Sequence, residues 1–214
     1  MGSDDLFKKR KLRDAASYKR DTEQKGKDRD LFLIVCEGTK SEPQYFQGFG
    51  LSNTHMVGVG GSPLTVVDCA INEINKSKRK RSRIAYDQVW CVFDRDSFPK
   101  DNFNEAIAKA GRNDIQVAYS NEAFELWYIL HFEYLNTGVN RQDYMTKLNK
   151  LLGVKYEKNE KNIHELLLRS GGSQTQAINN AKNLLKLYDP IDPESNKPST
   201  RVHVLVEELL KYKK

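Results

Sequence analysis

Runs of consecutive apolar residues, each about the length of a β-strand, place the tightest constraint on how this chain can fold. Residues 31–36 read LFLIVC and residues 89–93 read VWCVF, with no charged or amide side chain in either run. A strand with one solvent-facing side alternates apolar and polar residues, so continuous runs are typical of strands buried on both faces of a parallel sheet. Residues 55–60 and 115–119 complete a set of four expected strands.

Helical patterns lie between these runs. Residues 42–48, 63–83 and 104–110 are expected to be helices, the second of them opened by a Ser-Pro pair that suits a helix start. The alternation of strand and helix predicts an α/β fold, with a mostly parallel four-stranded sheet and helices on both of its faces. Residues 122–132 are apolar around most of a helix circumference and are expected to be a helix buried against the sheet.

The rest of the chain is expected to be helix and loop, with further helices at 141–152, 163–168, 175–187 and 200–212. We therefore expect an α/β core over residues 30–132 and a helical extension packed on it over 133–214. Residues 1–29 have almost no periodic apolar positions and are expected to form a basic flexible tail. A sharper interpretation makes this tail an arm that reaches nucleic-acid phosphates.

Composition narrows the class of protein. The 214 residues hold 35 Lys and Arg against 29 Asp and Glu, and the net charge of +6 permits a nucleic-acid partner without establishing one. The three cysteines have no CxxC spacing, which excludes a disulfide framework and a cysteine-rich zinc site. The sequence has no apolar run of about 20 residues and no apolar signal segment, so we expect a cytoplasmic protein with no membrane partner.

Acidic residues follow two of the expected strands. Glu37 comes directly after the first, with Glu42 five positions on, and Asp94 and Asp96 follow the third. Parallel sheets bind ligands at the carboxyl ends of their strands, and Asp94 and Asp96 point to the same side of an extended segment. Carboxylates gathered in one crevice repel each other and need a cation, and oxygen ligands without Cys or His favour Mg²⁺ or Mn²⁺ over Zn²⁺.

Each acidic motif has a plainer interpretation when taken alone. An acid after a strand is often only a helix cap, and an Asp-x-Asp pair by itself is a weak signal. The joint occurrence of Glu37-Gly38 and Asp94-Arg-Asp96 at the ends of two apolar strands, one βα unit apart, is much harder to explain by chance. The combination therefore favours a functional site.

Four segments of the sequence carry a resemblance to a known family. They read VCEGTKSEPQYF at 35–46, FDRD at 93–96, NEAFELWYILHF at 121–132 and NKPSTRVHVLV at 196–206. Glu-Gly after a first strand and Asp-x-Asp after a later one resemble the Toprim domain of topoisomerases, bacterial primases and OLD-family nucleases. The order and spacing of all four segments resemble most closely the RloB family, which includes abortive-infection proteins of the AbiL type.

The resemblance implies a Toprim-like catalytic domain and assigns roles to its acids. Glu37 would be the general acid or base, and Asp94 and Asp96 would hold Mg²⁺. Glu42 matches a second acid of the nuclease branch, where it can serve a second metal. The sequence departs from the pattern, because the OLD-type spacing is one residue shorter and topoisomerases have a third aspartate where this chain has Phe98. One metal ion is therefore the expectation.

Other side chains are candidates of lower rank. The resemblance brings in Glu125 as a catalytic candidate, with Asn121 and His131 behind it, although a histidine on an apolar helix is more often a core residue. Lys40 or Arg95 could neutralise charge on a phosphate as a cationic clamp, and either could equally be solvated.

A dense basic run ends the helix expected before the third strand. Six of the eight residues from 76 to 83 are Lys or Arg, including Lys78, Arg79, Lys80 and Arg81. They suit contact with nucleic-acid phosphates, and they suit equally a solvated end of a helix, where cations complement the helix dipole.

Three functions are compatible with these observations. The first is a Mg²⁺-dependent nuclease that acts on DNA or RNA, with tRNA among the candidates, in anti-phage or abortive-infection defence. The second is a non-catalytic or conditionally active metal-binding subunit of a defence complex with an ATPase partner protein, since the chain itself has no GxxxxGK[ST] motif. The third is a metal-dependent nucleotidyl or glycosyl transferase that uses the Asp-x-Asp pair. The preceding Glu37-Gly38 pair argues against the third.

Overall fold

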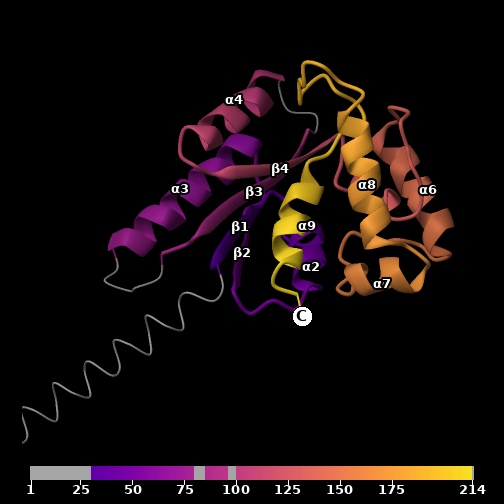
Figure 1. Ribbon diagram of the computed structural model, residues 1–214, viewed down its shortest axis with the longest axis horizontal. Coiled ribbons are helices and arrows are strands. Elements are labelled where there is room, and N and C mark those ends of the chain that lie inside the picture. The colour runs from indigo at the N-terminus through magenta and orange to yellow at the C-terminus, as the bar shows by residue number, and fades with distance from the viewer. Residues whose placement is uncertain (1–29, 80–84, 96–99, 214) are drawn as a thin grey trace, which may run out of the picture. The chain divides into compact units, whose positions relative to one another are not determined.

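A computed structural model describes residues 30–79, 85–95 and 100–213 of the chain. Residues 31–214 form one compact unit, which is built on a four-stranded sheet with all strands parallel (Figure 1). The strand order is β2-β1-β3-β4. The strands are β1 (Phe32–Cys36), β2 (Thr54–Gly58), β3 (Gln88–Arg95) and β4 (Gln116–Asn121). The predicted α/β fold class is confirmed.

The two strands with continuous apolar runs occupy the centre of the sheet. Every residue of β1 is fully buried, and β3 is buried from Val89 to Asp94. The register places Cys36 of β1 beside Val92 of β3, so both strands end at the same edge of the sheet. This pairing brings the acids that follow the two strands to one place.

Helices cover both faces of the sheet, and each face has its own apolar core. On one face lie α3 (Pro63–Arg79) and α4 (Lys100–Gly111), which pack against the side chains of Leu33, Val35 and Cys91. On the other face lie α2 (Ser41–Gln47) and α9 (Val202–Leu210), as Figure 1 shows, and α5 (Glu125–Ile129) packs in the same core. Because successive side chains of a strand point to opposite faces, both cores need apolar residues, and this explains the runs without alternation.

The helices of the C-terminal part share the second core. They are α6 (Arg141–Leu152), α7 (Ile163–Arg169) and α8 (Gln174–Leu185), which precede α9. After α8 the chain returns to the sheet, where Thr200 forms an antiparallel bridge with Ser120 of β4. The return places α9 beside β4 and covers that edge of the sheet. No helix among the described residues is long and apolar enough to cross a membrane.

The helix expected over residues 122–132 is shorter than predicted. Only Glu125–Ile129 is helical, because Glu122 has a φ of +83°, a left-handed conformation that no α-helix continues. All five residues of α5 are buried, in agreement with the apolar pattern. The expected tail (1–29), the basic residues Lys80 and Arg81, and Asp96 lie outside the described residues.

Candidate functional site

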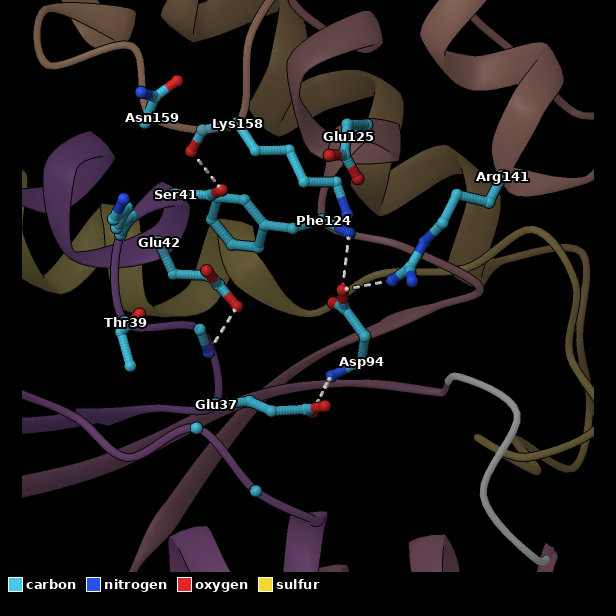
Figure 2. Close-up of a pocket in the computed structure, with 14 residues that line it drawn as sticks. Glu37, Thr39, Ser41, Glu42, Asp94, Phe124, Glu125, Arg141, Lys158 and Asn159 are labelled. Atoms are coloured by element: carbon cyan, nitrogen blue, oxygen red, sulfur yellow. Dashed lines mark hydrogen bonds and ion pairs between the residues drawn. The ribbon is translucent and has the colours of Figure 1, made fainter.

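A pocket lies at the carboxyl edge of the sheet, where β1 and β3 end. Its volume is about 610 Å³, and Figure 2 shows the side chains around it. The lining comes from the β1–α2 loop with the first turn of α2, the loop after β2, the end of β3, the start of α5, and the C-terminal helical part. The lining residues are Glu37, Gly38, Thr39, Lys40, Ser41, Glu42, Gly60, Gly61, Asp94, Phe124, Glu125, Arg141, Lys158 and Asn159.

Glu37 and Asp94 meet directly across the two central strands. The backbone N–H of Glu37 donates to the carbonyl of Val92 at 2.8 Å, which extends the parallel ladder by one residue beyond β1. The backbone N–H of Asp94 donates to Glu37 Oε2 at 3.0 Å. The strand pairing therefore fixes the Glu37 carboxylate beside the backbone of Asp94.

Glu42 enters the same pocket from the first turn of α2. Its side chain folds back on the preceding loop, where the N–H of Gly38 donates to Glu42 Oε1 at 3.0 Å. A Cβ atom at position 38 would lie 2.0 Å from Glu42 Oε2, so only glycine leaves room for this carboxylate. The Glu-Gly motif thus has a physical reason: its glycine makes space for the second acid.

Asp94 lies at the base of the pocket and is 7% exposed. Its Oδ2 accepts hydrogen bonds from the backbone N–H of Phe124 at 3.0 Å and from Arg141 Nη2 at 3.5 Å (Figure 2). Its Oδ1 is buried and has no hydrogen-bond partner among the described residues. A buried carboxylate oxygen without a partner is costly, and it is the kind of atom that a cation would satisfy.

Burial and neighbouring negative charges raise the pKa of two acids of the pocket, Asp94 and Glu42. Burial raises the pKa of the Asp94 carboxyl well above its usual range, and the negative charges of Glu42 and Glu125 raise it further. Burial also raises the pKa of Glu42, against the hydrogen bond from Gly38. Glu125 itself is 3% exposed in the first turn of α5. Four acidic side chains therefore share the lining of one pocket with Lys40, Arg141 and Lys158.

The oxygen donors of the pocket suit a small, hard cation that keeps part of its water shell. Within the part of the chain that the structure describes, no group of three or more His, Cys, Asp or Glu side chains is arranged to hold a metal ion. The available donors are carboxylate oxygens, chief among them Asp94 Oδ1 with Glu37 nearby. Mg²⁺ is bound through one or two carboxylates and keeps several waters, so this donor set fits Mg²⁺ or Mn²⁺ rather than a metal enclosed by protein ligands.

Two cations of the pocket were not predicted from the sequence. Arg141 is the first residue of α6, and its ion pair with Asp94 lowers the pKa of that acid against the effect of burial. Lys158 lies between α6 and α7, and its side chain points into the pocket (Figure 2). Neither residue has a motif around it. A single Arg or Lys in a polar segment gives no signal in one sequence, and only the packing of the helical part against the sheet brings these two to the acids.

Lys40, Arg95 and Asn121 occupy different places. Lys40 lines the pocket and is exposed. Arg95 does not line it, because neighbouring strand residues alternate and its side chain pairs instead with Glu194 at 2.8 Å. Asn121 is buried, and its Nδ2 donates to the carbonyls of Pro193 and Glu194. Asn121 therefore anchors the segment after α8 rather than facing the acids.

His131 and the described end of the basic run, Lys78 and Arg79, lie away from the pocket. His131 is fully buried in the core, where its Nδ1 is 2.9 Å from the carbonyl oxygen of Trp127. Its burial lowers its pKa to about 4, which keeps the ring neutral. Lys78 and Arg79 end α3 just before the segment that leads to the start of β3, at the opposite edge of the sheet from the acids (Figure 1).

Comparison with known proteins gives one match. The family model of the RloB-like protein matches residues 32–209, from the first residue of β1 to the last turn of α9. The match therefore includes every described acid and cation of the pocket. No curated protein and no solved structure matched the chain. Because the family model covers most of its length, this chain belongs to the RloB-like protein family.

Proposed function

We propose that this protein is a metal-dependent nuclease of the Toprim type, which hydrolyses phosphodiester bonds in DNA or RNA. The observation that carries the proposal is the meeting of Glu37 and Asp94 in a pocket that also holds Glu42 and Glu125. Two acids at the ends of adjacent parallel strands, one of them with an unsatisfied buried oxygen, suit the hydrolysis of a charged ester.

Asp94 Oδ1 would hold the cation, with Glu37 or Glu42 as a second donor and Asp96 added from the sequence motif. A bound Mg²⁺ or Mn²⁺ supplies stabilisation of the charge that develops on the phosphate. It would also offset the mutual repulsion of the acids, which is a cause of the raised pKa of Asp94. The cation would lie beside the buried Asp94, with three further acids in the lining of the same pocket.

Glu37 is proposed as the general acid or base. Its carboxylate is partly exposed to the pocket, and the N–H of Asp94 holds its Oε2 at 3.0 Å. The other oxygen can exchange a proton with water or with the leaving group while this hydrogen bond keeps the side chain oriented. The buried position of Glu125 suits a supporting role at the wall of the pocket.

The wider role follows from the resemblance of the sequence to abortive-infection proteins. We propose that the nuclease acts in the cytoplasm in defence against phage, with nucleic acid as its substrate. The second candidate is a metal-binding subunit that becomes active only with a partner such as an ATPase. It rests on the same acids, which would bind the metal in either case.

Cleavage of a mixed substrate panel tests the proposal. Plasmid DNA, single-stranded DNA and total tRNA would be incubated with the protein and Mg²⁺, Mn²⁺ or EDTA. We expect cleavage that depends on the metal and falls at least roughly a hundredfold in Glu37→Gln, a variant that keeps the size of the side chain and removes its proton transfer. Glu105→Gln, at an exposed acid of α4, is the matched control and should cleave at the wild-type rate.

Each other outcome has a defined meaning. Equal cleavage by wild type and Glu37→Gln would remove Glu37 from the mechanism. No cleavage of any substrate by a wild-type protein that still binds Mn²⁺ would favour the subunit that waits for its partner. No Mn²⁺ binding and no cleavage would contradict the proposed function altogether.

A further inference from the structure

Of the described cationic side chains that line the pocket, Arg141 and Lys158 belong to the C-terminal helical part and Lys40 to the β1–α2 loop, whereas the acids come from the strand ends and from α2 and α5. Arg141 opens α6, and Lys158 lies in the segment between α6 and α7. In the view of Figure 2, Arg141 reaches the pocket from the right and Lys158 from above, next to Ser41, with Glu125 between them. Arg141 and Lys158 thus reach the acids from a part of the fold that supplies none of the acids lining the pocket.

Arg141 occupies a position that its own helix disfavours. It is the first residue of α6, where the helix dipole repels positive charge. A capping box fixes this helix start, because Asn140 Oδ1 accepts from the N–H of Asp143 at 3.0 Å and Asp143 Oδ2 accepts from the N–H of Asn140 at 3.4 Å. A positive charge at the start of a helix is unfavourable for that helix, so we infer that Arg141 serves an interaction outside α6.

The guanidinium of Arg141 pairs with Asp94 and is also partly exposed. It approaches Asp94 Oδ2 at 3.5 Å, and its side chain is 35% exposed while that of Asp94 is 10% exposed. Arg141 is therefore partly open to the pocket, in which it is a lining residue. A guanidinium presents five N–H donors in a planar fork, so it can contact a carboxylate and a phosphate oxygen at once.

The backbone of Lys158 is held beside the acids by hydrogen bonds of its segment to α2. Ser41 Oγ donates to the carbonyl of Lys158 at 2.8 Å, and Gln44 Nε2 donates to that of Asn159 at 3.5 Å. These bonds fix the segment on the first turn of α2. The described residues offer the ammonium group of Lys158 no ion-pair partner within 4 Å, although it points into an acidic pocket (Figure 2).

This arrangement suits a phosphate group that contacts both Arg141 and Lys158 beside the acids. An anion cannot bind to the acids alone, and a metal ion does not need the two cations. A phosphodiester with a divalent cation needs both, because one phosphate oxygen can face the cation at the acids and another can accept hydrogen bonds from Arg and Lys.

We propose that Arg141 and Lys158 bind the phosphate that is to be cleaved, so that α6 and the segment after it form the phosphate-binding side of the site. The inference rests on the proposed nuclease function for its reaction. Its binding part can be tested without cleavage. Arg141 would contact Asp94 as well as the phosphate. Lys158 would add a point charge that reaches the same phosphate.

The test measures binding in Arg141→Gln and Lys158→Gln. Lys150→Gln is the matched control, because Lys150 is exposed on α6 about two and a half turns beyond Arg141, on the opposite side of the helix, and does not line the pocket. Fluorescent single-stranded DNA and RNA oligonucleotides would be titrated at several salt concentrations with Ca²⁺ present, and Mn²⁺ binding would be titrated separately. Circular dichroism would show that each variant is folded.

We expect the oligonucleotide affinity to fall about tenfold in each pocket variant and to change less than about twofold in Lys150→Gln. The slope of affinity against salt should drop by about one for each phosphate that the protein no longer neutralises. Affinity for Mn²⁺ should stay the same or rise in Arg141→Gln, because a positive charge beside Asp94 has been removed. Arg141→Lys and Lys158→Arg keep the charge and should recover part of the affinity.

Several outcomes would overturn the inference. Equal losses of oligonucleotide affinity in Lys158→Gln and Lys150→Gln would show only the effect of net charge. A loss of Mn²⁺ affinity in Arg141→Gln would show that Arg141 positions Asp94 for the metal instead of binding phosphate. Failure of the wild type to bind either oligonucleotide would also overturn it. If the wild type cleaves and Glu37→Gln does not, while both pocket variants behave as wild type, the nuclease proposal stands and this inference fails. If the binding losses appear without any cleavage, the inference stands and the nuclease proposal fails.

Discussion

At the scale of single residues, the packing of the pocket depends on a glycine, Gly38. Gly38 has no Cβ, and the carboxylate of Glu42 fills that space while accepting the Gly38 N–H. Gly58, at the end of β2, serves a similar purpose, because a Cβ there would lie 2.7 Å from the Cα of Thr39. The β1–α2 loop therefore lies close to its neighbours only because two positions have no side chain.

The substitution Gly38→Ala tests this packing. The new methyl group would meet Glu42 Oε2 at 2.0 Å, and Glu42 is only 5% exposed, so its carboxylate must move within a packed site. We expect a loss of about 1–3 kcal/mol in the free energy of unfolding, measured in urea, together with weaker Mn²⁺ binding. Gly111→Ala is the control, because nothing lies within 4 Å of a Cβ at that position. Equal unfolding midpoints for the two variants would contradict the prediction.

At the scale of secondary structure, the start of α6 links stability to the site. The capping box of Asn140 and Asp143 determines where the helix begins, and the first residue after the cap is Arg141. A helix that frays at this end would lose the fixed direction of the Arg141 side chain. The cap should therefore affect both the folding of the chain and its binding of phosphate.

Asn140→Ala removes the capping oxygen and should lower the free energy of unfolding by about 1 kcal/mol. It should also weaken oligonucleotide binding severalfold, because Arg141 is less well held. Ser173→Ala is the matched control: Ser173 caps α8 by accepting from the N–H of Gln176 at 3.3 Å and lies outside the pocket. It should lose a similar amount of stability and keep its affinity. A loss of affinity in both variants would show that the weaker binding does not depend on the position of Arg141.

At the scale of the whole molecule, the sequence was informative where the physics is local. The apolar runs predicted the central strands, and the strand-end position of Glu37 and Asp94 predicted their meeting, since parallel strands end at one edge. The presence of Arg141 and Lys158 in the pocket could not be predicted, because these side chains reach the acids only through the packing of the helical part on the sheet. The start of α5 could not be predicted either, because nothing in the sequence signals the left-handed conformation of Glu122.

The core that joins the sheet to the C-terminal helices contains buried histidines, and His203 shows what acid should do to it. His203 lies on α9 and is 4% exposed, and its Nδ1 has no hydrogen-bond partner among the described residues. Burial lowers its pKa to about 4; the charge of Glu207 opposes this, and those of Lys182 and Arg201 add to it. An unfolded chain takes up this proton near pH 6.5.

The unfolded state therefore binds more protons than the folded state between about pH 6.5 and pH 4, and His203 makes the fold less stable as the pH falls through this range. At pH 5 its contribution should cost roughly 2 kcal/mol relative to pH 8. His203→Leu removes both the titration and an unsatisfied buried nitrogen, so urea unfolding at pH 5 and pH 8 should show a smaller loss of stability on acidification than in the wild type. His203→Gln, which is polar but does not titrate, should show the same reduced loss. A pH dependence unchanged in both variants would mean that the acid sensitivity arises elsewhere in the core.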